Sequence, residues 1–315
     1  MNRQSNVTVA SSPGVGGRRF RPGPIDGWLL LLTVIWGSNF SIVKVALTEI
    51  PPLAFNTLRL CLASAVFLLV MRLRGVEWPS RSDLGGLLGL AVSGHLLYQL
   101  CFMAGLNRTS VSNSSLIIGS GPIAVALLAV WVGQERVTPW HWLGALLSVG
   151  GLCLVVSGPS GSGQSLQGDM LMFGAVLCWS LYTVGARPLL ARRTPMAVTG
   201  YSLILGTVMY LPVGLGELVR LDWQAVSLGT WISLVYSAVF ALCVAYLIWY
   251  TAVQRIGSAR TSIYSNLVPV VAMAVAAVWL GESLGPRKVL GAAAVLAGVA
   301  VTKLGATAPV LAPEE

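Results

Sequence analysis

The residues that could do chemistry in this sequence are a few polar groups inside long apolar stretches. Arg59 carries a guanidinium in one stretch, His95 an imidazole in another, and Ser38 and Asn39 form a polar pair in a third. In hydrocarbon, a charged or hydrogen-bonding side chain is costly unless it faces protein or water. These groups are therefore candidates for contacting a polar solute. His95 is also a candidate proton carrier, because imidazole titrates near neutral pH.

Each of these groups also has a structural interpretation, which the sequence leaves open. Ser38 and Asn39 could join helices by hydrogen bonds. Arg59 could bind backbone carbonyls or extend toward the interface, and it could equally line a wet cavity or hold a solute carboxylate. His95 could be a hydrogen-bonded packing residue.

Aromatic and amide side chains add further candidates for solute contact. Tyr98 follows His95 by three positions, which places both on nearly one face of a helix. Pro122 and Pro269 interrupt two apolar stretches and are candidate hinges, because proline removes a backbone hydrogen bond and bends a helix. Aromatic rings suit amphipathic solutes, although at helical spacing they also pack helices or anchor them at an interface. The remaining candidates are Trp36, Asn113, Trp179, Tyr182, Tyr246, Tyr264 and Asn266.

The patterns that mark enzymes, pumps and metalloproteins do not occur. The five cysteines lie in apolar stretches without CxxC or CxxH spacing, so we expect no metal site and no cofactor. The Gly/Ser-rich loop near residue 160 holds no GxSxG motif, and the chain has no Walker loop. An intramembrane enzyme and a nucleotide-driven pump are therefore disfavoured.

Composition identifies the class of protein that must position these groups. Of 315 residues, 55% are hydrophobic and only 10% are charged, and the mean hydropathy is +0.77. A soluble domain carries roughly 25% charged residues, so this chain is an all-α polytopic membrane protein. About 20 helical residues cross the hydrocarbon core. Ten apolar spans, none of which contains an acidic residue, meet this requirement: 28–45, 53–71, 84–104, 114–132, 140–156, 170–189, 196–215, 231–253, 262–280 and 289–303.

The basic residues predict the orientation of the chain. The net charge of +9 indicates topology here rather than nucleic-acid binding, because the basic residues lie between apolar spans. With the N-terminus inside, 14 Lys and Arg residues fall on the inner side and five on the outer side. Both termini are therefore expected in the cytoplasm, with the first 26 residues as a disordered tail.

The two halves of the sequence resemble each other. At an offset of 147, Pro122 matches Pro269 and Glu135 matches Glu282. In the first span the offset is 143, where Trp36 matches Trp179. Five spans per half is an odd number, so the second half must cross the membrane in the opposite sense. The predicted organisation is a tail at 1–26, a five-helix repeat at 27–157, a linker at 158–168, a second repeat at 169–305 and a tail at 306–315.

On these residues the chain resembles a known family. The stretch Trp36-Gly37-Ser38-Asn39-Phe40, Arg59 in the second span, and the Gly-Glu or Gly-Gln-Glu helix endings are similar to the EamA-type branch of the drug/metabolite transporter superfamily. The resemblance covers residues 27–305. It implies ten helices in inverted five-helix repeats and a central cavity lined by the first, third, fourth, sixth, eighth and ninth helices. The sixth span departs from the pattern, because Trp179-Ser180-Leu181-Tyr182 has no counterpart of Asn39.

These observations predict an inner-membrane secondary transporter, an exporter of amino acids or related small metabolites working by alternating access. A multidrug or other small-solute facilitator of the same fold and an intramembrane enzyme are the alternatives. Transport is expected to be coupled to protons through His95 or to be plain facilitated export. The expected partners are a small-molecule substrate and membrane lipid. Rows of small residues also suggest a homodimer, although packing within one chain explains them as well.

Overall fold

A computed structural model describes residues 24–134, 139–156 and 165–304. Within these ranges every regular element is a helix. The first half comprises α1 (Pro24–Ala46), α2 (Pro52–Leu73), α3 (Arg81–Leu90), η1 (Ala91–Leu97), α4 (Tyr98–Arg108), α5 (Val111–Gly119), α6 (Gly121–Trp131) and α7 (Pro139–Val156). The second half comprises α8 (Leu166–Gly185), α9 (Arg187–Leu190), α10 (Pro195–Val219), α11 (Leu228–Tyr236), η2 (Ser237–Val244), α12 (Ala245–Ile256), α13 (Ser258–Ser262), η3 (Ile263–Asn266), α14 (Leu267–Trp279) and α15 (Pro286–Leu304).

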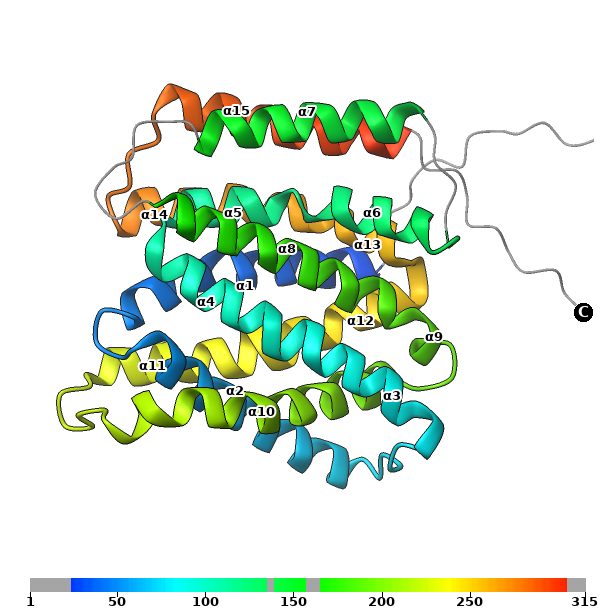
Figure 1. The fold of residues 1–315 in the computed structure, drawn as a ribbon, viewed down its shortest axis with the longest axis vertical. Helices are drawn as coiled ribbons and strands as arrows, with labels where there is room; N and C mark the ends of the chain where they lie inside the picture. The colour runs from blue at the N-terminus through cyan, green and yellow to red at the C-terminus, as the bar shows by residue number, and fades with distance from the viewer. Residues whose placement is uncertain (1–23, 135–138, 157–164, 305–315) are drawn as a thin grey trace, which may run out of the picture.

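The helices lie side by side with their axes roughly along one direction (Figure 1). The pair α7 and α15 forms the outermost layer at the top of the view, above α5, α6, α13 and α14. Below them come α8, α1, α4 and α12, and then α2, α10, α11 and α3. The start of α1 and the end of α15 lie at the same end of the bundle.

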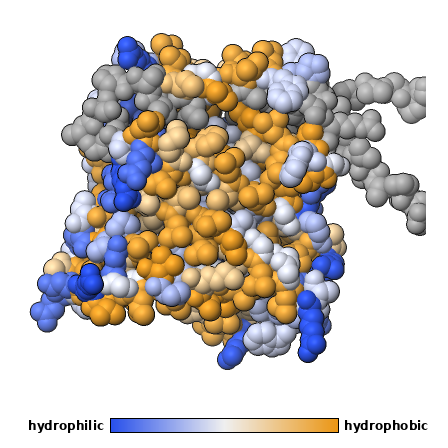
Figure 2. Space-filling model, in the orientation of Figure 1, coloured by the Kyte–Doolittle hydropathy of each residue, from blue (hydrophilic) through white to orange (hydrophobic). Residues whose placement is uncertain are grey.

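The surface has the composition that lipid requires. In the described part of the chain, seven helical stretches are long and apolar enough to cross a membrane, and they contain seven of the ten predicted spans. Figure 2 shows hydrophobic residues across the middle of one face and hydrophilic ones gathered toward the helix ends. The predicted spans 140–156, 262–280 and 289–303 lie in α7, in α13 to α14 and in α15. That these three also cross the membrane stays a prediction.

Several helices begin earlier than their predicted spans. Because α1 starts at Pro24 and α8 at Leu166, each takes an aspartate into its first turn. Asp26 and Asp169 are both buried, with 7% and 4% of their surface exposed. Thr109 donates a hydrogen bond to Asp169, and Tyr264 donates one to Asp26. The predicted spans themselves hold no acidic residue, but the helices extend beyond them where apolar content is too low to signal a span, and Asp83 lies in the same way in the first turn of α3.

Each half contains a π-helical turn at a matched place. In the first half η1 joins α3 to α4, and in the second half η2 joins α11 to α12. A π turn holds more residues than an α turn and is frequent at functional sites. At Gly94, in η1, a β-carbon would lie 2.1 Å from the ring of Tyr182, so only glycine allows this close approach.

Counterpart helices of the two halves pack against one another. The main helix pairs include α2 with α10, α5 with α14, and α7 with α15. Gly151 and Gly298, which match at the 147 offset, both lie where α7 meets α15. A β-carbon at Gly151 would lie 2.7 Å from the carbonyl oxygen of Gly291, and one at Gly298 would lie 2.5 Å from that of Gly144. This small-residue row therefore serves packing within one chain, and a homodimer stays a prediction.

Candidate functional site

A partly open cavity lies in the middle of the bundle. We call it the central cavity. Its walls come from the helices that the family resemblance implies, namely α1, α4, α5 to α6, α8, η2 to α12, and α13 to α14. The helix α2 adds one residue, Arg59. The cavity is therefore built jointly by both halves of the chain.

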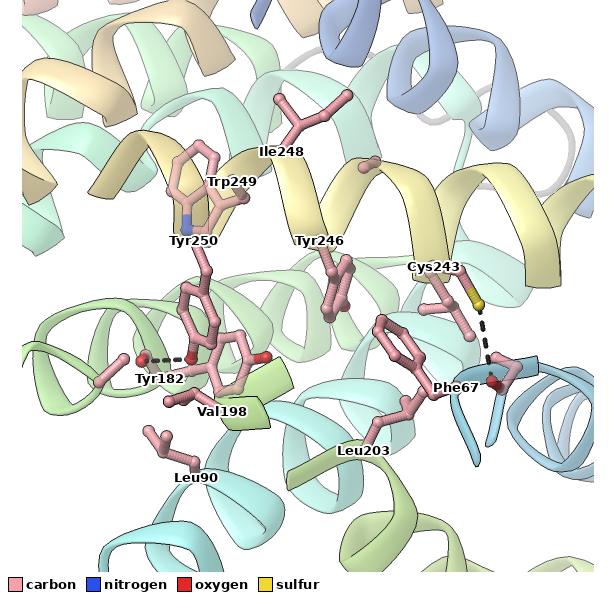
Figure 3. Packing of buried hydrophobic residues seen from close by; sticks show 14 of the residues in the cluster. Phe67, Leu90, Tyr182, Val198, Leu203, Cys243, Tyr246, Ile248, Trp249 and Tyr250 are labelled. Carbon is pink, nitrogen blue, oxygen red and sulfur yellow. Dashed lines mark hydrogen bonds between the residues drawn. The ribbon is translucent and has the colours of Figure 1, made fainter. Parts of the chain in front are cut away.

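Aromatic rings make up much of the wall. The Trp36 ring centroid lies 5.4 Å from that of Trp179, 6.0 Å from that of Tyr246 and 5.4 Å from that of Trp249. Tyr98 lies 5.2 Å from Trp179. Figure 3 shows Tyr246 and Trp249 projecting from α12 on different sides. These large, rigid side chains suit a solute with an apolar or aromatic body.

Arg59 brings a positive charge to this wall. The residue is 2% exposed, and its three hydrogen bonds all go to neutral oxygens. Nε donates to Oδ1 of Asn56 at 3.1 Å, Nη1 donates to the Ser237 hydroxyl at 2.9 Å, and Nη2 donates to Oε1 of Gln99. Gln99 in turn donates to the Tyr246 hydroxyl at 3.3 Å. Of the readings open for Arg59, the structure favours the lining of a cavity over binding to backbone carbonyls.

The acidic residues within the described ranges have their partners elsewhere. Asp83 binds Arg192 and Arg193, and Glu77 binds Arg193. Other carboxylates cap helices or loops: Glu217 accepts from the first amides of α2, Glu282 from those of α5, Glu49 from Ser227 and Asp222 from Gln224. Asp26 and Asp169 accept hydroxyl hydrogen bonds at helix starts. In this part of the protein, no carboxylate neutralises Arg59.

Two polar atoms at the cavity wall have no hydrogen-bond partner. They are Oδ1 of Asn39 and Nε1 of Trp249, and both are buried. The first can accept from a solute N–H or O–H, and the second can donate to a solute oxygen. Unsatisfied buried polar groups are costly, so their place beside a cavity favours a solute as the missing partner.

The structure brings half of the expected contact residues to the cavity wall: Trp36, Asn39, Arg59, Tyr98, Trp179 and Tyr246. Others lie behind it. The Ser38 hydroxyl donates to the Val34 carbonyl oxygen and shares a 2.8 Å hydrogen bond with Tyr236. His95 is fully buried, with its Nε2 3.3 Å from the Ser202 hydroxyl and its ring packed against Tyr182 and Tyr246.

The remaining candidates lie in α5, in η3 or in α8 beside α12. Tyr182 packs on Tyr250, whose hydroxyl donates to the Tyr182 carbonyl oxygen (Figure 3). Asn113 and Asn266 are buried outside the wall, and Tyr264 is bonded to Asp26. Direct solute contact by these residues stays a prediction.

The two prolines lie at helix breaks. Pro122 is in the first turn of α6, directly after α5 ends, and it lines the cavity. Pro269 follows the 3-10 turn η3, and its ring would lie 2.4 Å from a β-carbon at Gly119. The helix breaks at these positions, as proline predicts, whereas a hinge motion there stays a prediction.

Sequence reasoning missed several wall residues. Gln99 is an amide in an apolar stretch, the same signal that singled out Asn39. Phe40 and Phe102 are ordinary apolar residues by type, and only the three-dimensional arrangement shows that they face the cavity. Among the described residues, no group of three or more His, Cys, Asp or Glu side chains could hold a metal ion.

Comparison with known proteins identifies the family. The profile of the EamA-like transporter family matches residues 24–157 and again residues 166–304, which together make up most of the chain. The chain belongs to the EamA-like transporter family. It is therefore a multi-pass membrane transporter, as expected for the inner (plasma) membrane, and the names of its relatives indicate transport rather than catalysis.

Several EamA relatives carry names that describe a solute. A probable terminal-alkyne amino-acid exporter of Streptantibioticus cattleyicolor is 30% identical over 86% of this chain and 91% of its own length. A probable amino-acid metabolite efflux pump of Salmonella typhimurium is 29% identical over 89% of this chain and 95% of its own length. A third relative, whose name describes no solute, is the uncharacterized transporter YyaM of Bacillus subtilis. It is 28% identical over 86% of this chain and 90% of its own length.

A solved structure also shares the EamA fold seen here. A protein of known crystal structure that is 18% identical superposes with a TM-score of 0.65 and covers 88% of this chain and 96% of its own. At this identity the likeness concerns the arrangement of helices alone. It agrees with the all-helical architecture described above.

Proposed function

We propose that this protein exports amino acids or related small metabolites, and that it does so by alternating access between two inverted five-helix repeats. The observation that carries this proposal is the central cavity, which both halves of the chain build and which holds one guanidinium among aromatic rings. Relatives named as exporters of amino acids or of their metabolites support the same class of solute.

The repeat is supported by contacts between residues that match in the two halves. In a two-fold arrangement, equivalent residues can touch each other only at the axis. Trp36 touches Trp179 at the 143 offset, and Gln99 donates to Tyr246 at the 147 offset. The Ser148 hydroxyl likewise donates to the carbonyl oxygen of Val295, 147 positions away. These pairs support a two-fold axis that passes through the cavity, with ten membrane crossings and both termini on one side.

Matched contacts also join the halves at both ends of the bundle. At one end, Asp83 in the first turn of α3 binds Arg192 and Arg193 before α10. At the other end, Glu49 before α2 accepts a 2.8 Å hydrogen bond from the amide of Ser227, which caps α11. Glu49 and Arg192 match at the 143 offset, so equivalent positions form the junction at each end. The residue at this position is acidic at one end and basic at the other. Alternating access needs two such junctions, each opening while the other stays closed.

The alternative functions find less support. A multidrug facilitator would use the same aromatic wall, but a buried guanidinium is an unusual requirement for neutral or cationic drugs. An intramembrane enzyme needs a nucleophile with a base to activate it, and the described wall offers the hydroxyls of Ser262 and Ser265 but no His, Asp, Glu or Lys beside them.

Counterflow in proteoliposomes tests the export proposal. Vesicles preloaded with unlabelled amino acids or their N-acyl derivatives should accumulate the same labelled solute, whereas empty vesicles should not. Gly121→Phe provides a plug, because a β-carbon at this buried wall residue meets nothing within 4 Å. We expect at least a tenfold loss of counterflow in this variant.

Gly89→Phe is the matched control, because Gly89 is exposed and its β-carbon position is equally open. It should leave counterflow unchanged. The proposal fails if no amino-acid-related solute moves, or if the plug and the control behave alike.

A further inference from the structure

The electrical charge of the central cavity points to the charge of its solute. Arg59 is the only charged residue among the wall residues of the described chain, and its hydrogen-bond partners are neutral. The empty cavity therefore carries one positive charge. A charge at this depth is costly unless it is hydrated or paired, so a solute that cancels it is favoured over one that does not.

Solutes of one shape but different charge would load this cavity differently. A monoanion gives a loaded cavity with no net charge. A zwitterion brings its own ammonium and leaves the cavity with the same positive charge as before, and a cation doubles that charge. Asn39 offers an uncharged oxygen to an ammonium, which cannot cancel its charge. The wall thus favours one carboxylate and disfavours a free amino group.

The hydrogen bonds of Arg59 leave donors for that carboxylate. A guanidinium has five N–H groups, and the three hydrogen bonds of Arg59 use one from each nitrogen. One N–H remains on each of Nη1 and Nη2, and guanidinium N–H groups can bind the two oxygens of a carboxylate together. The unpartnered Nε1 of Trp249 is a further donor at the same cavity.

We propose that the central cavity selects organic monoanions, with the carboxylate bound by Arg59 and an uncharged, largely aromatic body held among the tryptophans, and that these anions leave the cell by electrogenic uniport. The proposal rests on the proposed export function and narrows its solutes to acids that lack a free amino group, such as N-acylated or deaminated amino acids.

Electrogenic uniport also supplies the driving force. Each cycle moves one negative charge outward, a direction that an inside-negative membrane potential favours. At a potential of about 100 mV, the equilibrium concentration of a monoanion is about 45-fold higher outside the cell than inside. Export of this kind requires no coupling ion. His95 lies behind the wall, and the buried carboxylates Asp26 and Asp169 lie at helix starts outside it.

The selectivity claim is tested by binding to the purified full chain. The probes share one body: N-acetylphenylalanine is a monoanion, phenylalanine a zwitterion and phenylalaninamide a cation. We expect N-acetylphenylalanine to bind at least tenfold more tightly than phenylalanine, with the amide weakest. Arg59→Gln should reduce the preference for the monoanion to less than about threefold. Arg72→Gln, an exposed arginine of the same helix, should keep it.

The electrogenic claim is tested in proteoliposomes loaded with labelled N-acetylphenylalanine. Valinomycin and potassium gradients set the potential. Efflux should be faster when the interior is negative and slower when it is positive, and a pH gradient at zero potential should leave it unchanged. Protein-free vesicles measure leakage of the probe.

The outcomes separate this inference from the proposed function. Equal binding of phenylalanine and N-acetylphenylalanine, or efflux driven by a pH gradient and indifferent to potential, would overturn the monoanion inference. Phenylalanine counterflow blocked by Gly121→Phe would still uphold export. If none of the amino-acid-related solutes moves, the export function fails and the monoanion inference fails with it.

Discussion

Trp36 and Trp179 stand 143 positions apart in the sequence, and their rings meet edge to face, with centroids 5.4 Å apart and planes at 86°. Each is the counterpart of the other in the two halves of the chain. Their contact joins the halves at the wall of the central cavity, where Tyr246 and Trp249 also pack on Trp36. The halves therefore meet through side chains that also line the central cavity.

This contact predicts a measurable coupling energy. In a double-mutant cycle of Trp36→Ala and Trp179→Ala, we expect a coupling of about 1 kcal/mol in the free energy of unfolding in mixed micelles, as for other edge-to-face aromatic pairs. A second cycle that combines Trp28→Ala with Trp179→Ala is the control, because Trp28 lies on the same helix and is 53% exposed. A coupling near zero in the first cycle would contradict the prediction.

The α7–α15 contact predicts intolerance of side chains at Gly298. Its β-carbon would lie 2.2 Å from the Ser148 hydroxyl oxygen and 2.5 Å from the Gly144 carbonyl oxygen, and backbone cannot yield easily. Gly298→Val should destabilise the protein by about 3 kcal/mol, the upper range for overpacking. Gly150→Val, at an exposed and open position of α7, should change stability little. Equal melting temperatures for the two variants would show that the helices are not this close.

The junctions at the two ends of the bundle should respond differently to salt. Asp83, with 2% of its side chain exposed, binds two arginines, whereas Glu49 binds a backbone amide. We expect Asp83→Asn to cost about 1–2 kcal/mol, since both arginines are partly exposed. The melting temperature of the native protein should fall between 0.05 and 0.5 M NaCl, and this decrease should be smaller in Asp83→Asn.

Glu49→Gln serves as the comparison for that experiment. Because the partner of Glu49 is uncharged, its replacement should leave the salt dependence of the native protein in place. Identical salt dependence in Asp83→Asn and in the native protein would rule out an ionic junction at that end.

The surroundings of His95 predict that it does not carry protons for transport. It is enclosed by Tyr182, Tyr246 and Ser202 behind the cavity wall. His95→Gln should therefore leave the response of counterflow to a pH gradient unchanged, even if the variant is less stable. Transport that is driven by a pH gradient in the native protein and loses this drive in His95→Gln would assign the proton to His95.

Much of the fold follows from the sequence because the membrane imposes it. Apolar length predicts where helices run, and the match of Pro122 with Pro269 predicts where two of them break. The ends of helices are less predictable. Asp26 and Asp169 lie in first turns that are too polar for apolar length to predict, and only their tertiary partners show that these turns are buried.

The candidate site was predictable by residue type but not by direction. Arg59 and Asn39 are polar residues in apolar surroundings, and both reach the cavity wall. His95 is equally unusual in its surroundings, yet it lies behind the cavity wall. A helix that is apolar on every side carries no periodic signal of its inward face, so the sequence cannot show which polar residue faces the cavity. The η1 turn adds to this, because it ends two residues before Gln99 and changes the helical register there, and therefore the direction in which Gln99 points.

The π turns η1 and η2 set which side chains line the cavity downstream of them. Tyr98 and Gln99 are the first and second residues after η1, and Tyr246 is the second residue after η2. Tightening either turn to α geometry would release about one residue, and successive residues of a helix differ by 100° around its axis. Everything beyond the turn would then swivel by that angle. Rotation at these two turns would replace the side chains that line the cavity by others of the same helices, while the outer helices keep their places in the lipid.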